Sequence, residues 1–360
     1  MAVSESLLYF WLSRARLGAH RVNELLETAP PGALWDDFGR FRDVWGDKYA
    51  VLRDSRDADF LQEELARMRA AGISVMTRAN PAFPERLRQR EVSPPVALYV
   101  KGDVSLLSVP SVAVVGTRAC SNYGQTMAQR LASGLAAANV AVVSGLATGI
   151  DGYALRAALD AGGKVVTVLP SGLDRITPVS HAALFAEIAD KGLAVSELPP
   201  GTEAMKFTFP ERNRLIAGLS LGTAVVEAPA KSGALLTAGF ALEQGREVFA
   251  VPGNVTSPRS AGTNALIADG AVLVTSADDI LSGLGLRRPA AARKDDMHVS
   301  PDECRIIELL EREGAAHFDA LCDRLGMKPY ELTPILVELE LKDLILRLPS
   351  NTYGIKDLLR

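Results

Sequence analysis

The feature that most constrains the fold is a series of short, valine-rich apolar runs between residues 112 and 274. Apart from Thr167, each run is apolar at successive positions, and segments with helical periodicity separate most of them. Strands that are apolar on both faces and alternate with helices belong to a parallel sheet that is covered on both sides. The sequence therefore predicts a doubly wound α/β domain, with strands at residues 112–115, 140–143, 165–169, 194–195, 224–226, 248–251 and 272–274.

The rest of the 360-residue chain predicts additional domains, since about 150 residues per domain is usual. Residues 1–65 have short helical periodicity and hold all three tryptophans, Trp11, Trp35 and Trp45, so we expect a small helical domain. X-Pro steps in the following stretch favour extended backbone. This stretch should wrap onto the sheet, which gives one domain over residues 66–285.

A turn around Gly18 in the first domain allows two interpretations. Apolar residues at helical spacing follow it, so it could form half of a helix-hairpin-helix, whose backbone amides grip phosphate. A plain pair of antiparallel helices explains the same pattern and is the interpretation that we favour. DNA contact by this domain is therefore not expected from the turn alone.

The C-terminal part begins after a linker rich in alanine, proline and charge, at residues 286–298. Ser300, Pro301 and Glu303 form the start signal of a capped helix, and Gly314 ends it. Two more helices follow, and residues 344–347 can pair with 352–355 as a hairpin. Residues 299–360 are thus predicted to form a winged-helix-like domain.

The third helix of this tail, at roughly residues 329–342, is acidic. A helix that enters the major groove of DNA should not be acidic, because phosphate repels it. We therefore interpret the tail as a protein-contact module or a vestige. The charges on which this depends are Glu331, Glu338 and Glu340 against only Lys328 and Lys342.

Composition excludes several classes of protein. No run approaches the ~20 uncharged apolar residues of a membrane-spanning helix. The three cysteines are scattered, which disfavours a disulfide framework or a zinc site and favours a cytoplasmic location. The net charge is −4, and no segment is basic overall, so any binding of an anion must depend on a local cluster of cations.

Glycine-rich loops follow most of the predicted strands. Ligands of open parallel sheets bind beyond the carboxyl ends of the strands, and backbone amides in such loops favour phosphate. Tight turns explain these glycines equally well, and Asp151 and Ser232 could simply cap helices. The candidate phosphate-binding backbone comprises Gly116, Thr117, Ser144, Gly145 and Gly149. Lys231, Ser232 and Gly233, in a later loop, are candidate DNA-binding residues.

Neither of the two common nucleotide-binding signatures is present. Residues 116–120 do not form GxGxxG, and the sequence contains no GxxxxGK[ST]. A dinucleotide oxidoreductase and a P-loop ATPase are therefore disfavoured.

Residues 206–214 gather cations, aromatic rings and an amide. Single-stranded nucleic acid needs such a combination, because bases stack on rings for about 1–3 kcal/mol each and the backbone pairs with cations. Alternatively, Phe209 is the hydrophobic staple of the following helix, with Pro210 at its first position and solvated arginines beyond. Arg118 and Lys231, at neighbouring strand ends, favour the first interpretation. The candidate DNA-binding side chains here are Lys206, Phe209, Arg212, Asn213 and Arg214.

Catalytic machinery is sparse. The four histidines are scattered along the chain, which gives little support to a catalytic triad or a metal site. Glu197 and Glu227 follow strands and could act as acids or bases, but such carboxylates more often cap a helix or pair with an arginine. The sequence predicts a binding protein without a cofactor or a metal, and not an enzyme.

Five motifs follow one another along the chain, at residues 116–118, 144–151, 209–220, 232–238 and 262–267. With them, residues 70–285 resemble the DNA processing protein A (DprA/Smf) family. The resemblance implies an extended Rossmann-like domain and a cytoplasmic homodimer that binds single-stranded DNA. It also implies that the protein protects incoming DNA in natural transformation and loads RecA recombinase onto it. The family's DNA contacts correspond here to Arg118, Lys206 and Phe209. Arg212, Asn213 and Arg214 extend the same motif, either as further DNA contacts or as residues that orient the loop.

Two other classes of function remain open at this point. Nucleotide phosphoribohydrolases share the fold and the glycine loops, but they carry a PGGxGTxxE loop with a catalytic glutamate. The corresponding residues 231–234 have no glutamate before Glu243, so a nucleotide-binding or phosphoribohydrolase-like enzyme is the weaker alternative. A structural adaptor that binds no nucleic acid is the other.

Overall fold

The computed structural model describes residues 3–15, 18–286, 300–341 and 344–355. The chain divides into two compact units, Met1–Pro289 and Ala290–Arg360. The predicted linker at residues 286–298 lies outside the described residues except for Leu286, and so does Lys342.

The first unit is built around a nine-stranded sheet with the order β1-β2-β6-β5-β4-β3-β7-β8-β9. The strands from β6 to β9 in this order run parallel to one another. They confirm the seven strands that the apolar runs predict. Their bounds are β3 (Ser111–Val115), β4 (Ala141–Ser144), β5 (Val165–Leu169), β6 (Leu193–Ser196), β7 (Gly222–Val225), β8 (Glu247–Ala250) and β9 (Val272–Leu273).

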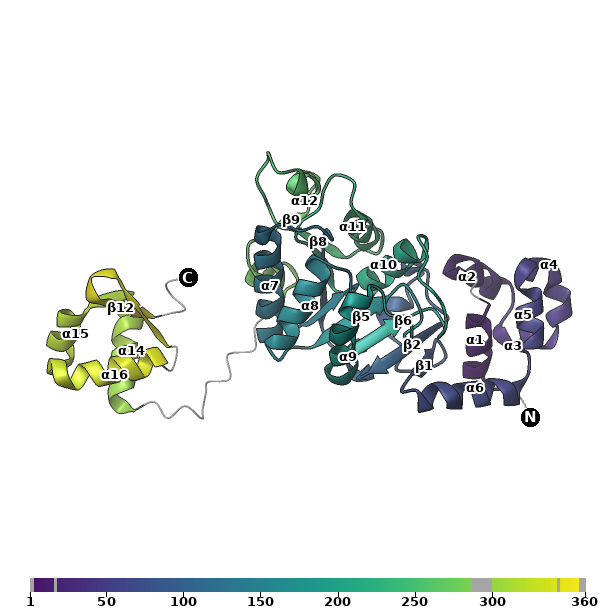
Figure 1. Cartoon of the computed structure of the whole chain (residues 1–360), viewed down its shortest axis with the longest axis horizontal. Helices are drawn as coiled ribbons and strands as arrows, with labels where there is room; N and C mark the ends of the chain where they lie inside the picture. Colours follow the sequence, from purple (N-terminus) through teal and green to yellow (C-terminus); the bar gives the residue numbers. More distant parts are fainter. Residues whose placement is uncertain (1–2, 16–17, 287–299, 342–343, 356–360) are drawn as a thin grey trace. The chain divides into compact units, whose positions relative to one another are not determined.

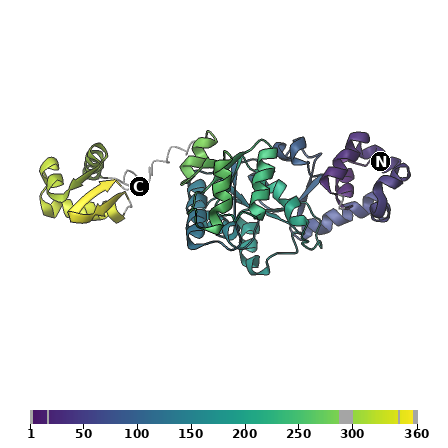
Figure 2. The ribbon, with the colours of Figure 1, turned by 90° about the horizontal axis from the view of Figure 1, so that it is seen from above.

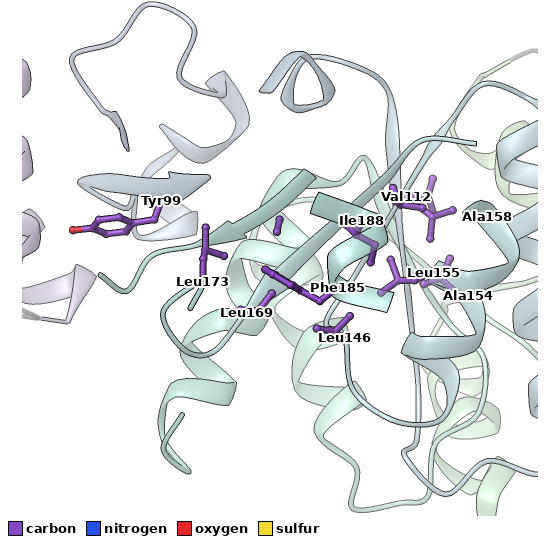
Figure 3. Packing of buried hydrophobic residues seen from close by; sticks show 14 of the residues in the cluster. Tyr99, Val112, Leu146, Ala154, Leu155, Ala158, Leu169, Leu173, Phe185 and Ile188 are labelled. Carbon is purple, nitrogen blue, oxygen red and sulfur yellow. The ribbon is translucent and has the colours of Figure 1, made fainter. Parts of the chain in front are cut away.

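Helices cover both faces of this sheet, as the doubly wound fold requires (Figure 1). Within β3, Val112 and Val114 pack into the core on one face, and Ala113 and Val115 pack into the core on the other. Figure 3 shows part of the first core, which includes Val112 of β3 together with Leu155 and Ile188. The first face carries α7 (Asn122–Ala137), α8 (Ile150–Asp160), α9 (Ala182–Lys191) and α13 (Ala277–Gly283), and the second carries α10 (Thr208–Leu219) and α11 (Gly233–Glu243). The short helix α12 (Ala261–Ala268) precedes β9.

Two antiparallel strands, β1 (Ser74–Thr77) and β2 (Ala97–Gly102), extend the sheet beyond β6. The sequence predicts extended backbone that wraps onto the sheet in this stretch, but not these strands. Both strands are short, and a proline-rich segment separates them in the sequence. The pattern of apolar residues therefore does not show that they pair.

The N-terminal helices lie beside β1 and β2 in both views (Figures 1 and 2). Trp11 packs edge-on against Trp35 and Trp45, with ring centroids 5.1 and 5.9 Å apart. Tyr99 of β2 points toward these helices (Figure 3), and its hydroxyl is 2.8 Å from that of Ser13. The helices are α1 (Glu5–Ser13), α2 (Ala19–Thr28), α3 (Pro31–Asp36), α4 (Arg42–Trp45), α5 (Tyr49–Asp54) and α6 (Ala58–Ala70).

The expected domain boundary near residue 65 falls inside α6, which continues to Ala70. The helix carries the chain directly to β1, and contacts such as that between Ser13 and Tyr99 join the N-terminal helices to the sheet. These contacts explain why residues 1–289 form one compact unit.

The second unit has the predicted winged-helix arrangement. Ser300 and Glu303 form the expected capping box of α14 (Pro301–Glu313), and Gly314 ends that helix with φ +82°. Two further helices, α15 (Phe318–Leu325) and α16 (Pro329–Leu341), pack with α14 around an apolar core. The strands β10 (Ala315–His317), β11 (Ile345–Leu348) and β12 (Thr352–Ile355) form a sheet with the order β10-β12-β11, and β11 and β12 are the predicted hairpin.

Candidate nucleic-acid interface

The connection of the strands creates a switch point at β3. The chain runs from β3 through β4 and β5 to β6 on one side, then returns to place β7 on the other side of β3. Ligands of such sheets bind where the loops diverge at the carboxyl ends of the strands. A cavity of about 340 Å³ lies there, between the loops after β3 and β7 and the start of α10.

The walls of this cavity, which we call the switch-point cavity, bring together most of the predicted site residues. Lys206, Arg214, Ser144, Gly145 and Gly149 are not part of these walls. Those in the walls are Gly116, Thr117, Arg118, Phe209, Arg212, Asn213, Lys231, Ser232 and Gly233.

Arg118 and Phe209 form the most informative contact in the cavity. The guanidinium carbon of Arg118 lies 5.0 Å from the centroid of the Phe209 ring, within the range of a cation–π interaction. Arg118 is exposed and Phe209 is half-buried, so both present surface to a ligand. The same pair also borders a smaller cavity of about 80 Å³, beside Gly145 and Pro178.

Phe209 does not have the position of a hydrophobic staple. A staple residue precedes the N-cap of its helix, whereas α10 begins at Thr208 and its N-cap is Phe207. Phe209 is therefore the second residue of α10, and Pro210 is the third and not the first. The helix starts earlier than the proline suggests because Thr208 already closes a turn with Met205.

Arg212 is buried beneath the cavity, where it supports the loops. Its Nη1 donates to the carbonyl oxygen of Gly145 at 2.6 Å and to that of Val168, and its Nε donates to Oδ1 of Asn213 at 3.2 Å. The Nδ2 of Asn213 in turn donates to the carbonyl oxygen of Gly233 at 3.3 Å. Through these two side chains, α10 joins the loop after β4 to the start of α11.

The charge of Arg212 faces Asp151, which is also buried. Burial lowers the pKa of Arg212 to about 10, against the raising effect of Asp151, so Arg212 stays protonated at neutral pH. Burial raises the pKa of Asp151, and Arg212 together with hydrogen bonds from the backbone of Ala147 and Gly145 opposes that rise. The N-cap of α8 is Gly149, so the alternative that Asp151 caps this helix is wrong.

Arg214 is buried as well, and it forms an ion pair with Glu197 and donates to the carbonyl oxygen of Val92 at 3.2 Å. This placement of Arg212 and Arg214 differs from the expectation that both side chains contact DNA. Because α10 packs along the sheet, Arg212 and Arg214 face the interior of the fold. Asn213, between them, is held by its hydrogen bonds within the fold. Glu197 is thus the partner of an arginine.

Three small residues, at the end of β4 and in the loop that follows it, support the site from below. The hydroxyl of Ser144 donates to the carbonyl oxygen of Val114 at 2.7 Å. A Cβ atom on Gly145 would lie 2.4 Å from Nη1 of Arg212, so only glycine leaves room for that guanidinium. Gly149 has φ +79°, and a Cβ atom there would lie 2.4 Å from the carbonyl oxygen of Thr117.

The loop after β3 is anchored to the end of β7. The N–H of Thr117 donates to the carbonyl oxygen of Glu227 at 2.7 Å, and the Glu227 carboxylate accepts from the N–H and the hydroxyl of Ser121 at 2.8 and 2.7 Å. Glu227 therefore holds the start of α7, which accounts for its charge without an acid–base role. Ser232 caps α11 as the sequence allows, with its hydroxyl oxygen accepting from the N–H of Ala234 at 3.3 Å.

Lys231 and Lys206 are both exposed. Lys231 lies in the cavity wall opposite the start of α10, whereas Lys206 lies in the turn that leads into α10. Sequence reasoning missed Asp151 as part of the cavity, because its position two residues after Gly149 is typical of a helix cap.

Other features bear on the alternatives. Among the residues that the structure describes, no group of three histidine, cysteine, aspartate or glutamate side chains could hold a metal ion. Glu243 is the last residue of α11, at the end of the helix far from the cavity. Within the same described ranges, no helix has the length and apolarity to cross a membrane.

Together these features define a Rossmann-like α/β protein with a cation-lined cavity at its switch point and a winged-helix domain. The chain belongs to the family described as DNA recombination-mediator protein A, whose model matches residues 74–285. A second model, the DprA winged helix domain, matches residues 288–351.

Individual relatives agree with this assignment. Protein Smf of Escherichia coli (strain K12) is 42% identical over 266 residues, which cover 71% of each chain. The X-ray structure of DNA processing protein A from Streptococcus pneumoniae has a TM-score of 0.67 and 36% identity, and covers 78% of this chain and 98% of that one. A structure of DNA processing protein A from Helicobacter pylori, whose title reports a single-stranded DNA binding mode, has a TM-score of 0.52 and 32% identity, covering 59% and 95%.

Proposed function

We propose that this protein binds single-stranded DNA at the switch-point cavity. The observation that carries the proposal is the contact between Arg118 and Phe209, which puts an exposed cation beside a half-exposed ring. A nucleotide presents an anionic phosphate and a flat base within a few ångströms of each other. One side-chain pair of this kind therefore matches both parts of a single nucleotide.

The surrounding residues fit the path of a DNA backbone. Lys231 adds a second cation in the cavity wall, and Ser232 and Gly233 open α11 there, where the positive end of the helix favours a phosphate. Gly116 and Thr117 line the same cavity beside Arg118. Lys206 supplies a cation in the turn before α10.

Arg212, Asn213 and Arg214 act mainly as positioning residues in this proposal. The two arginines are buried, and Asn213 bridges Arg212 to Gly233. Ser144, Gly145 and Gly149 have the same supporting role, because they shape the loops on which Arg118 is displayed.

Duplex DNA is a poorer ligand for such a site. In a duplex the bases stack on one another, so their faces are not available to Phe209 without unpairing. We therefore propose a preference for single strands over double strands.

Membership of the recombination-mediator family supports a more specific role. We propose that the protein protects incoming single-stranded DNA in natural transformation, loads RecA recombinase onto it, and acts in the cytoplasm as a homodimer without catalysing a reaction. The support is the family itself and the relatives named DNA processing protein.

The binding proposal is tested by fluorescence anisotropy with labelled oligo-dT and a duplex of equal length over a range of salt. If Arg118, Lys206 and Lys231 each neutralise one phosphate, the logarithm of the association constant should fall with that of salt with a slope of about −2 for single strands. Equal affinity for both DNAs would contradict the preference. Unchanged anisotropy at low salt and micromolar protein would favour an adaptor that binds no nucleic acid.

The mediator role needs a separate measurement. RecA assembly on single-stranded DNA that is coated with a single-strand binding protein should be faster when this protein is present. DNA binding without any acceleration would leave the binding proposal intact and contradict the role in loading RecA.

A further inference from the structure

A second and larger cavity lies away from the switch point. It has a volume of about 460 Å³, within the usual range for ligand sites, and it opens between the N-terminal helices and residues 197–211. Leu12 and Val22 of α1 and α2 form one wall, and Met205 and Phe207 form part of the other. Its walls share no residue with those of the switch-point cavity.

The second cavity has an unusually exposed apolar rim. Met205 and Phe207 keep 55% and 60% of their surface exposed, although both are large apolar residues. The turn that carries them is ordered by the Thr208 hydroxyl, which accepts from the N–H of Met205 and donates to its carbonyl oxygen. Methionine and aromatic residues held in this way are typical of surfaces that bind protein segments.

One carboxylate at this cavity has no ion-pair partner within the described part of the chain. Glu197 pairs with Arg214, and Glu203 pairs with Arg175 at 3.4 Å. Glu211 also lies in the wall, and no ion pair to Glu211 occurs among the residues that the structure describes. The one lysine of the walls, Lys48, pairs with Asp47 at 2.7 Å.

Glu211 is an exposed residue of the cavity wall, and its surroundings affect its carboxyl group in opposite directions. Partial burial raises the pKa of Glu211 and repulsion from Glu197 raises it further, whereas the nearby charge of Arg214 lowers it. A cation that entered the cavity would oppose both of the effects that raise the pKa, because it would pair with the ionised carboxylate.

We propose that the second cavity binds a segment of a partner protein that has a lysine or arginine flanked by apolar side chains. The apolar side chains pack on Met205, Phe207 and the buried wall, and the basic group pairs with Glu211. Charge complementarity selects this occupant, since Glu211 is an anion in the wall that forms no ion pair with any of the described residues. The site does not depend on DNA binding, because the two cavities have separate walls.

The experiment uses the full chain and an array of short synthetic peptides. In each peptide, one arginine or lysine is flanked by leucine, phenylalanine or methionine, and matched peptides carry glutamine in place of the basic residue or serine in place of the apolar ones. We expect binding to weaken by about tenfold in each matched peptide, the size of one lost charge-assisted contact or apolar anchor. Equal binding of all peptides would overturn the proposal.

Glu211→Gln tests the charge at the proposed site. It should remove the advantage of a basic residue over glutamine while leaving binding to oligo-dT and the melting temperature close to wild type. Glu243→Gln, which removes the same charge from an exposed position outside the cavity, should keep that advantage. A Glu211→Gln protein that still prefers basic peptides would overturn the proposal.

The location is tested by nuclear magnetic resonance with ¹³C-methyl methionine. The Met205 signal, assigned with Met205→Leu, should shift in a saturable way when the preferred peptide is added. Binding that leaves this signal unchanged would place the peptide elsewhere and would contradict the proposed site.

Discussion

Arg118 lies over the ring of Phe209, with 5.0 Å between the guanidinium carbon and the ring centroid, although the two residues come from different elements. Arg118 belongs to the loop after β3, and Phe209 belongs to the first turn of α10. Both line the switch-point cavity and the smaller cavity beside it. A cation and a ring are thereby held together at the point where loops diverge.

Reversing the charge of Arg118 should weaken single-stranded DNA binding strongly. Arg118→Glu removes an attraction and adds a repulsion, so we expect affinity to fall by at least about tenfold at low salt, roughly 1.4 kcal/mol. Lys164→Glu is the matched control, since Lys164 precedes β5 at the amino edge of the sheet. Equal losses in both variants would point to overall charge and contradict a local site.

Removing the ring of Phe209 should reduce affinity without unfolding the protein. Phe209→Ala should lose about 1–3 kcal/mol of binding if a base stacks on the ring. Phe209→Tyr keeps the ring and should bind nearly as well as wild type. Anisotropy titrations measure the affinity and calorimetry the melting temperature, and a lower melting temperature with unchanged affinity would assign Phe209 to packing.

Replacing Gly149 should displace the loop that carries Arg118. Gly149→Ala would put a Cβ atom 2.4 Å from the carbonyl oxygen of Thr117, in addition to the strain of φ +79°. Gly162→Ala is a control for strain alone, about 1–2 kcal/mol, because its φ is +68° and nothing lies within 4 Å. Urea unfolding should show a larger loss for Gly149→Ala, and equal losses would mean that the loop relaxes freely.

Arg212 should be important for stability because it is buried opposite Asp151. Arg212→Met leaves that carboxylate buried without its cation, and we expect a loss of about 3–5 kcal/mol in the free energy of unfolding. Adding Asp151→Asn should recover part of the loss. Arg130→Met, on the exposed surface of α7, should change stability by no more than about 0.5 kcal/mol.

The raised pKa of Asp151 predicts a pH dependence of stability with a definite sign. Its folded pKa lies above the ordinary value of 3.8, so the folded state binds this proton more tightly than the unfolded state. The stability of wild type relative to Asp151→Asn should therefore be greatest below the ordinary value and decrease as pH rises through the folded pKa. Unfolding titrations of both proteins measure the difference, and an increase with pH would contradict the assignment.

The parallel part of the fold could be predicted from the sequence because its strands are apolar on both faces. Buried strands leave an unbroken run of apolar residues, as at residues 112–115, and the pattern needs no partner to be recognised. The strands β1 and β2 pair antiparallel at the end of the sheet, and the 3-residue β10 is too short for periodicity to show. Their existence depends on tertiary contacts.

The site could be predicted in part. The carboxyl ends of parallel strands share one edge, which is why Arg118, Phe209 and Lys231 meet as the sequence suggests. The burial of Arg212 and Arg214 was not predictable, because arginine is usually exposed and the sequence does not show which face of α10 meets the sheet. A glycine such as Gly145 signals a turn, but not that a guanidinium fills the space beside it.

The hydrogen bonds of Arg212 and Asn213 have a consequence for the energetics of DNA binding. They fasten the loop after β4 and the start of α11 to one rigid helix before any ligand arrives. A preorganised receptor loses little conformational freedom when it binds, so more of the interaction energy appears as affinity. The flexible partner is then the single-stranded DNA. We expect most of the conformational entropy that is lost on binding to come from ordering of the DNA.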